Sequence, residues 1–553
     1  MSEEDPSRAR AVVIAAAGST NDDSNISFAG SWLSKCLTTH PACNAISTHN
    51  HWYPSRLLRL DRARMGISIR LQDCKVEVPT GPYISLSHRW GQANFMTLNV
   101  KNIDTLKINI ALCDLSKTFQ DAVHATLSLG YNYLWVDSLC IIQDSEDDWL
   151  NEASTMDKVY QNALFTISAT NARSLTDGLG SMRYTDHVSC LYRDVRFDSG
   201  SQATKRAQIL HTGLWEGLVL HTPLNYRAWI LQERLLSPRI LHFGLFQLAW
   251  ECSELEACQT YPDGILPEMR DSWTLGGASR LALLPRRLSD HPPAKDEITY
   301  DWHHAWHSIV ERYTQCRLIK PSDMFIALSG IASNIRVQIQ DTYLAGLWKS
   351  SFVEDLGWQS TIPAGGHRPE AYYAPSWSWA AIDRPVSYRS RQEGIRHAAE
   401  LIDYNITLLD ENNPTGPVRG ASATLKGKLI EFQWDPRDRE ADGASTHPWK
   451  GPMRLAVSAE GLIGDETMYF GANEIQEDCT ADILQKAHGL VLRQEGQEFT
   501  GARLDGILLD QVSEALRPTS TRRISRRIGH FSVSGERCGT IMEWSRDATV
   551  TLI

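Results

Sequence analysis

Short apolar strands alternate with amphipathic helices from residue 57 to residue 169, and this alternation constrains the fold more than any other feature of the chain. Strands are predicted at residues 57–60, 67–71, 83–87, 133–137 and 164–169, and helices at residues 116–129 and 145–162. Two strands that are joined through a helix usually pair in parallel, because the helix crosses one face of the sheet. We therefore predict an α/β fold with a parallel sheet.

The second of these helices carries a capping pattern at its start. Ser145 precedes Asp148 by three residues, the spacing in which a hydroxyl caps the first turn and an acidic group lies near the positive end of the helix. Trp149, Ala153 and Met156 then fall on one face. The pattern predicts a helix with one buried side.

The length of the chain, 553 residues, indicates more than one domain, since a single core rarely grows beyond roughly 250–300 residues. Residues 1–30 are small and polar and are predicted to be a flexible N-terminus. Residues 31–260 are predicted to be the α/β core domain, and residues 261–420 a mainly helical and irregular accessory region. Residues 421–553 alternate as strands do and are predicted to be a β-rich C-terminal region.

Charge and cysteine content exclude several classes of protein. With 55 Lys and Arg against 66 Asp and Glu, the net charge is −11, which is unfavourable for binding nucleic-acid phosphate. Eleven cysteines without a C-x-x-C pair do not form the framework of a secreted disulfide domain, so we expect a reducing, cytoplasmic location. No stretch approaches the ~20 apolar residues of a membrane span. We predict no nucleic-acid partner and no membrane span.

Polar residues follow two of the predicted strands directly. The run at 83–91 places Ser87, Arg89 and Trp90 after one strand, and the run at 133–144 places Asp137 and Ser138 after another. Ligands of open α/β sheets bind outside the carboxyl ends of the strands. We therefore predict these five residues as a substrate-binding group.

Ordered motifs along the chain resemble one known family. They lie at residues 83–91, 133–144, 152–163, 227–237 and 373–379. Together they resemble the heterokaryon incompatibility (HET) domain of filamentous fungi, which would occupy the core domain at 31–260, with the last motif continuing the resemblance beyond it. The resemblance implies fungal non-self recognition, a form of innate immunity in which programmed cell death or growth arrest follows fusion of different hyphae. It also implies an incompatibility partner protein.

The first motif is also similar to the opening strand of TIR domains, with Ser87 and Arg89 in place and Trp90 inserted before Gly91. Some TIR domains hydrolyse NAD with a helix-borne glutamate, and Trp149-x-x-Glu152 has the matching spacing. The resemblance implies a TIR-like core and a catalytic Glu152 that stabilises the positive charge of an oxocarbenium-like transition state. The later TIR motifs are not evident.

Three functions stay open at this point: a trigger of cell death, a hydrolase of NAD or a related nucleotide, and a non-catalytic scaffold that self-associates into a homo-oligomer. Whether the chain is an enzyme at all is left open, because the first half of a helix by itself favours a carboxylate such as Glu152. We predict no cofactor and no metal ion. Cys36, His40 and Cys43 have helical spacing that suits zinc but lack an evident fourth ligand, so metal binding there is undecided.

Overall fold

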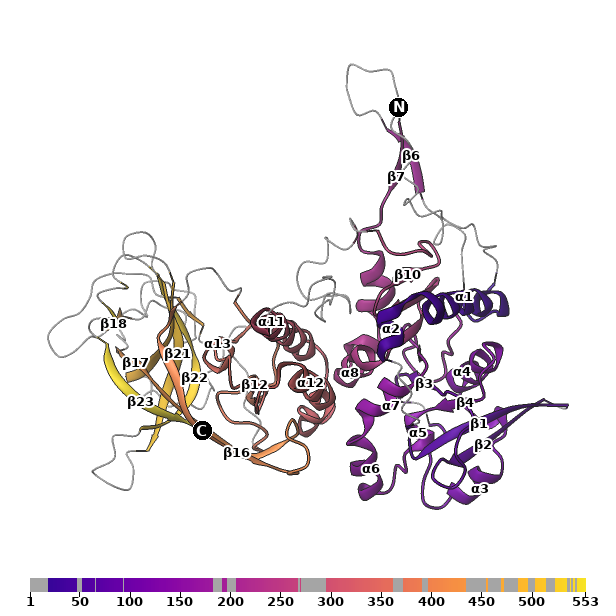
Figure 1. Ribbon diagram of the computed structural model, residues 1–553, viewed down its shortest axis with the longest axis horizontal. Helices are drawn as coiled ribbons and strands as arrows, with labels where there is room; N and C mark the ends of the chain where they lie inside the picture. Colours follow the sequence, from indigo (N-terminus) through magenta and orange to yellow (C-terminus); the bar gives the residue numbers. More distant parts are fainter. Residues whose placement is uncertain are drawn as a thin grey trace. The chain divides into compact units, whose positions relative to one another are not determined.

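The computed structural model forms two compact units, Met1–Arg286 (unit 1) and Arg287–Ile553 (unit 2). It describes residues 18–46, 52–64, 66–92, 94–182, 191–195, 205–266, 269, 295–361, 371–389, 396–433, 454–455, 469–471, 486–495, 503–513, 523–534, 538, 541–542 and 545–553. Residues 1–17 of the predicted flexible N-terminus lie outside these ranges. Figure 1 shows the elements of each unit, with their labels.

Unit 1 is built on a mixed sheet of eight strands in the order β10-β9-β8-β5-β3-β4-β1-β2. Its strands are β1 (Arg56–Ala63), β2 (Gly66–Asp73), β3 (Ile84–Ser87), β4 (Tyr133–Trp135), β5 (Thr166–Ser168), β8 (Arg239–Phe243), β9 (Leu248–Cys252) and β10 (Glu256–Cys258). The four central strands β4, β3, β5 and β8 pair in parallel, and the outer strands pair antiparallel. This arrangement confirms the α/β class, although the sheet is parallel only at its centre. β6 (Leu191–Val195) and β7 (Lys205–Ile209) form a separate hairpin.

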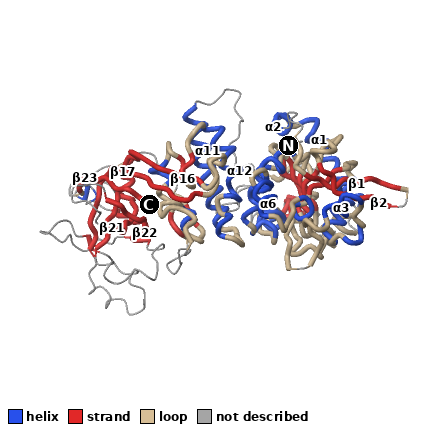
Figure 2. The backbone as a smooth tube through the Cα atoms, turned by 90° about the horizontal axis from the view of Figure 1, so that it is seen from below, coloured by secondary structure: helices blue, strands red, loops and turns tan. Residues whose placement is uncertain are grey.

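Helices cover both faces of this sheet. They are α1 (Asp23–Thr39), α2 (Pro41–Ile46), α3 (Ile103–Ile108), α4 (Lys117–Ser128), α5 (Asp137–Cys140), α6 (Glu146–Ala153), α7 (Met156–Asn162) and α8 (Ala228–Leu236). The short helical turns are η1 (Leu112–Asp114), η3 (Glu216–Leu220) and η4 (Leu224–Tyr226). In Figure 2 the strands of unit 1 run through the middle of the unit, with helices around them.

The residues directly before and after the central strand β3 show which helix covers which face of the sheet. The Tyr83 hydroxyl donates to the carbonyl of Val159 in α7 at 2.6 Å, whereas the His88 ring packs edge-on against Phe119 of α4. Successive side chains of a strand point to opposite faces, so α7 and α4 lie on opposite sides. All four residues of β3 are buried, as expected for a parallel strand that is covered on both faces.

Local structure differs from the sequence prediction at three places. The helix predicted at 145–162 is two helices, α6 and α7, because the hydroxyls of Ser154 and Thr155 donate to carbonyls of the preceding turn. Its cap is as predicted, since the Ser145 hydroxyl accepts from the Asp148 amide at 3.3 Å. The strand expected to reach residue 137 ends at 135, and α5 starts at Asp137. Helix α1 starts at Asp23, inside the segment expected to be flexible.

Unit 2 begins with helices and continues as a large sheet. Its helical elements are α11 (Lys295–Thr314), η5 (Pro321–Asp323), α12 (Ile326–Ile339), α13 (Phe352–Asp355) and η6 (Trp379–Ala381). It also has two small antiparallel strand pairs, β11 (Tyr343–Leu344) with β12 (Leu347–Trp348) and β13 (Gln359–Ser360) with β14 (Val386–Ser387). Figure 2 shows the helices α11 and α12 gathered apart from the large sheet of this unit.

The large sheet of unit 2 has nine strands and is mainly antiparallel. They are β15 (Arg396–His397), β16 (Ala399–Leu408), β17 (Val418–Gln433), β18 (Arg454–Leu455), β19 (Tyr469–Gly471), β20 (Lys486–Glu495), β21 (Arg503–Ser513), β22 (Arg523–Ser534) and β23 (Arg546–Leu552). Because β17 pairs with both β20 and β23, five of the strands close into a ring. The β-rich character expected at the C-terminal end is therefore present.

Tryptophans form much of the helical core of unit 2. Trp306 and Trp379 both donate from Nε1 to the carbonyl of Gly346 at 2.9 Å. Gly346 has a φ of +104°, and a Cβ there would lie 2.8 Å from Nε1 of Trp379. Only glycine fits this close approach. Among the described residues we find no helix with the length and apolarity that crossing a membrane requires.

Candidate functional site

The carboxyl ends of the two central strands β3 and β4 meet at one edge of the unit 1 sheet. β3 ends at Ser87, directly before His88, and β4 ends two residues before Asp137. Nε2 of His88 lies 3.4 Å from Oδ1 of Asp137. The first two sequence motifs therefore converge at the edge where open α/β sheets bind ligands.

Asp137 is held by two hydrogen-bond donors. Nε1 of Trp90 donates to Oδ2 at 2.9 Å, and the backbone amide of Ser138 donates to Oδ1 at 2.6 Å. These two hydrogen bonds fix the orientation of the carboxyl group. The side chain is 28% exposed, so solvent or a ligand reaches it directly.

A second carboxyl group, that of Glu233 in α8, interacts electrostatically with Asp137. Its pKa is raised to about 7, mainly by burial and also by the negative charge of Asp137, against the lowering effects of the Ser87 hydroxyl, Arg227 and Tyr160. Four of the sequence motifs therefore contribute to one cluster. Glu233 was not among the predicted site residues, although it lies within the motif at 227–237, whose structural and binding interpretations were equally compatible with the sequence.

His88 contacts both Asp137 and Arg227, the residue before α8. Its side chain is buried, and burial lowers its pKa, with Asp137 acting in the opposite direction. The imidazole is therefore neutral near neutral pH. Its backbone carbonyl accepts a hydrogen bond from the Arg227 guanidinium at 3.0 Å. This bond ties the start of α8 to the end of β3.

The predicted substrate-binding residues occupy different environments. Ser87, Trp90 and Asp137 belong to the cluster just described. Ser138 contributes its backbone amide to Asp137, and its side chain is fully buried. Arg89 is exposed on the loop after β3. Their role in binding a substrate stays a prediction.

Glu152, the predicted catalytic residue, has other neighbours. It is 2% exposed on α6, and burial raises its pKa, while the Ser55 hydroxyl and Arg56 lower it. Arg56 itself pairs with Asp148, one turn earlier on α6, and donates to the carbonyl of Cys140 at 2.7 Å. Glu152 thus lies in the contact between α6 and β1. Its catalytic role stays a prediction.

A buried ion pair fixes α8 against the sheet. The Arg234 guanidinium donates from Nε and NH2 to the two carboxylate oxygens of Glu251 in β9, at 2.8 and 2.7 Å. His242 of β8 lies 3.1 Å from the same carboxylate. All three are at most 5% exposed, and Arg234 holds the pKa of Glu251 below its usual range against the effect of burial. This two-point contact sets the position of Glu233, the residue before Arg234.

Two pockets stand out in the described part of the chain. One, of about 290 Å³, lies at the carboxyl ends of β5 and β8, between residues 169–181 and Phe243 and Leu245. The other, of about 660 Å³, lies in unit 2. There His307 pairs with Asp355 at 2.7 Å and stacks on Tyr388 with ring centres 3.8 Å apart. The smaller pocket shares the sheet edge that carries Asp137.

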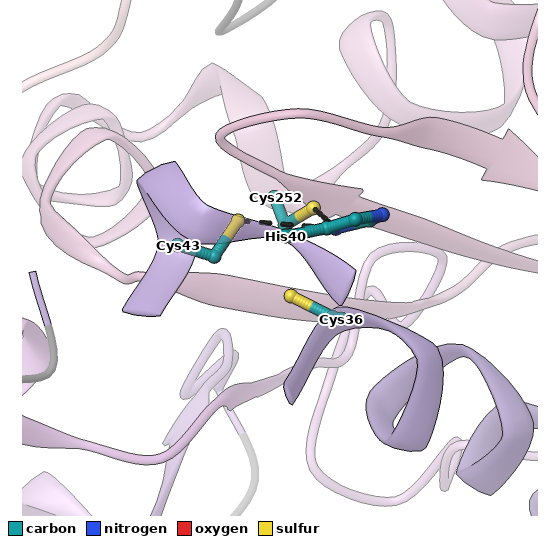
Figure 3. Close-up of side chains that lie close together, drawn as sticks. All are labelled: Cys36, His40, Cys43 and Cys252. Atoms are coloured by element: carbon teal, nitrogen blue, oxygen red, sulfur yellow. Dashed lines mark hydrogen bonds between the residues drawn. The ribbon is translucent and has the colours of Figure 1, made fainter. Parts of the chain in front are cut away.

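Residues suited to hold a metal ion form a separate group in unit 1. Cys36 of α1, His40 after it and Cys43 of α2 face one another, and Cys252 at the end of β9 joins them (Figure 3). Their ligand atoms all lie within 4.8 Å of one another. The fourth residue, 212 positions from His40, had no local signal in the sequence.

The comparisons with known proteins bear on the same region. Residues 83–233 match the family described as heterokaryon incompatibility protein (HET). Neither a curated protein nor a solved structure matches the chain. The matched segment runs from the start of β3 to Glu233, so it contains every member of the cluster around Asp137. Residues 83–233 are therefore identified as a heterokaryon incompatibility (HET) domain.

Proposed function

We propose that this chain acts in fungal heterokaryon incompatibility, as a cytoplasmic trigger of growth arrest or cell death. The HET domain supports this function. The observation that carries the proposal is the convergence of separate HET motifs on one buried polar cluster with a single solvent-accessible carboxylate, Asp137. An incompatibility partner or a second copy of the chain would act on this domain.

Induced expression in a filamentous fungus tests the trigger function. Wild-type protein should arrest growth, and Asp137→Asn, which removes the exposed charge but keeps the shape, should relieve the arrest. Asp104→Asn is the matched control, because the Asp104 side chain is 91% exposed on α3 and does not belong to the cluster around Asp137. Normal growth at full accumulation of the wild-type protein would contradict the proposal.

A second candidate function is hydrolysis of NAD or a related nucleotide, in keeping with a distant likeness to TIR domains. It is favoured by a carboxyl group at the sheet edge that two hydrogen bonds orient, and by the 290 Å³ pocket at the same edge. In this reaction the bond from ribose to nicotinamide breaks with its electron pair going to the nicotinamide nitrogen. Water then adds to the ribose carbon and releases a proton, and a carboxylate stabilises the positive charge between the two steps.

Release of nicotinamide by the purified protein separates the candidate carboxylates. We expect Asp137→Asn to lower the rate by about 10²–10³, the loss typical when one group that stabilises a transition-state charge is removed. Glu152→Gln is the decisive partner variant: an equal loss in a folded protein would support the sequence-based assignment to Glu152. Unchanged NAD with oligomers that grow with protein concentration would instead support the scaffold.

A further inference from the structure

Three cysteines and one histidine surround a common point where α1 and α2 meet β9 (Figure 3). Nδ1 of His40 lies 3.4 Å from Sγ of Cys252 and 4.0 Å from Sγ of Cys43. In a tetrahedral zinc site with Zn–S of about 2.3 Å and Zn–N of about 2.0 Å, neighbouring ligand atoms are about 3.5–3.8 Å apart. We propose that Cys36, His40, Cys43 and Cys252 bind one structural zinc ion.

The surroundings of the sulfur atoms suit thiolates. Three thiolates and a neutral imidazole around Zn²⁺ carry one net negative charge, and binding releases the three thiol protons to solvent. Nε of Arg239, a fully buried guanidinium, donates to Sγ of Cys36 at 3.1 Å. The backbone amide of Leu255 donates to Sγ of Cys252 at 3.3 Å. Both donors stabilise negative charge on sulfur, as outer-shell groups of zinc sites do.

Burial makes the site structural rather than catalytic. The three cysteines are fully buried, and His40 is 8% exposed. Four protein ligands complete the tetrahedron and leave no position for water or substrate. Cys36, Cys43 and Cys252 are not joined by disulfide bonds in the described structure, so their sulfurs can serve as metal ligands.

The site has a definite consequence for the architecture. Its ligands come from residues 36–43 and residue 252, on either side of the matched segment 83–233. Helix α1 packs against β9, and a bound metal ion would link the two elements through its coordination bonds. The flanking segments would then be part of one folded domain with the HET motifs. This inference does not depend on the proposed function.

Metal analysis of the full-length protein, purified without a metal-affinity tag, is the first test. We expect one zinc ion per chain by elemental analysis across the transition metals. Replacement by cobalt(II) should give the visible absorption of a tetrahedral centre and thiolate-to-cobalt charge-transfer bands. Wild-type protein that is folded but contains no metal and gives no cobalt spectrum would overturn the proposal.

Variants of the fourth ligand give the second test. Cys252→Ser should weaken zinc binding by more than the ~10–100-fold that loss of an outer-shell partner causes. Cys252→His, which keeps a ligand, should retain the ion. Cys258→Ser is the matched control, because Cys258 is equally buried on the adjacent strand β10 but lies outside the group. Full zinc content in Cys252→Ser would overturn the assignment.

Alkylation of the wild-type protein decides the matter even if Cys252→Ser does not fold. Bound zinc should protect Cys36, Cys43 and Cys252 from a thiol reagent, and a chelator with denaturant should release the zinc and expose all three. A disulfide between any two of them in the freshly purified protein, found by mass spectrometry, would overturn the zinc site in favour of an oxidised pair.

Discussion

Two buried glutamates of the HET domain, Glu233 and Glu152, lie in clusters of different kinds. Glu233 is surrounded by groups from the ends of β3 and β4 and from α7 and α8, and the cluster opens to solvent through Asp137. Glu152 is enclosed by Ser55 and Arg56 at the start of β1, with Asp148 on its own helix. The first cluster unites the family motifs, whereas the second joins α6 to an outer strand.

The two clusters differ in how the chain assembles them. The Trp-x-x-Glu spacing pointed to Glu152, which in the structure is 2% exposed beside the Arg56–Asp148 pair. Parallel pairing of β3 and β4 gathers polar groups at one sheet edge, where the charge of Asp137 contributes to the raised pKa of Glu233. Changes to the residues that hold each helix in place test this comparison.

The largest effect is expected at the anchor of α8. Arg234→Met leaves the fully buried carboxylate of Glu251 without its two-point partner, so we expect a loss of about 3–5 kcal/mol in the free energy of unfolding of unit 1. Urea unfolding measures it. The double variant Arg234→Met, Glu251→Leu should recover most of this loss, because it removes both charges. A loss in the double variant as large as in the single one would show that shape, not charge, anchors α8.

Protonation of Glu233 should produce the next largest effect, as a pH dependence of stability. The folded carboxyl, with a pKa of about 7, keeps its proton to higher pH than the unfolded one, whose ordinary pKa is 4.5. The unfolded state therefore binds fewer protons between these values, and stability falls as pH rises through this window, by about 3 kcal/mol in all. Glu233→Gln should remove that fall.

Urea unfolding at pH 5 and pH 8 measures the effect of Glu233→Gln. The exposed control Asp104→Asn should keep the wild-type pH dependence. An unchanged pH dependence in Glu233→Gln would show that the Glu233 carboxyl is ionised in the folded protein, contrary to its raised pKa.

The smallest effect is expected at the anchor of α6. Arg56→Met breaks its pair with Asp148, whose partners are 13% and 15% exposed, so solvent screens the interaction and we expect a loss of about 1–2 kcal/mol. Lys35→Met, which breaks a pair with partners 44% and 66% exposed, is the control and should change stability by less than about 1 kcal/mol. A loss at Arg56 equal to that at Arg234 would remove the contrast between the two anchors.

Much of the fold was predictable from local patterns. The strands at 57–60, 67–71, 83–87 and 164–169 and the helix at 116–129 all correspond to elements of the structure, because side-chain periodicity reports directly on burial. The break between α6 and α7 was not predicted, since the hydroxyls of Ser154 and Thr155 compete with a helical pattern that continues across them. The ring of strands in unit 2 depends on pairings between distant segments that no local pattern encodes.

The sequence by itself determined the α/β class, the HET motifs, the polar residues after β3 and β4, and the helical spacing of Cys36, His40 and Cys43. Tertiary structure alone decided that Glu233 belongs to the same cluster as Asp137 and that Cys252 completes the metal-binding group. The physical reason is that periodicity fixes the direction of a side chain within its own helix or strand. The distance between residues far apart along the chain is fixed only by how strands pair and helices pack.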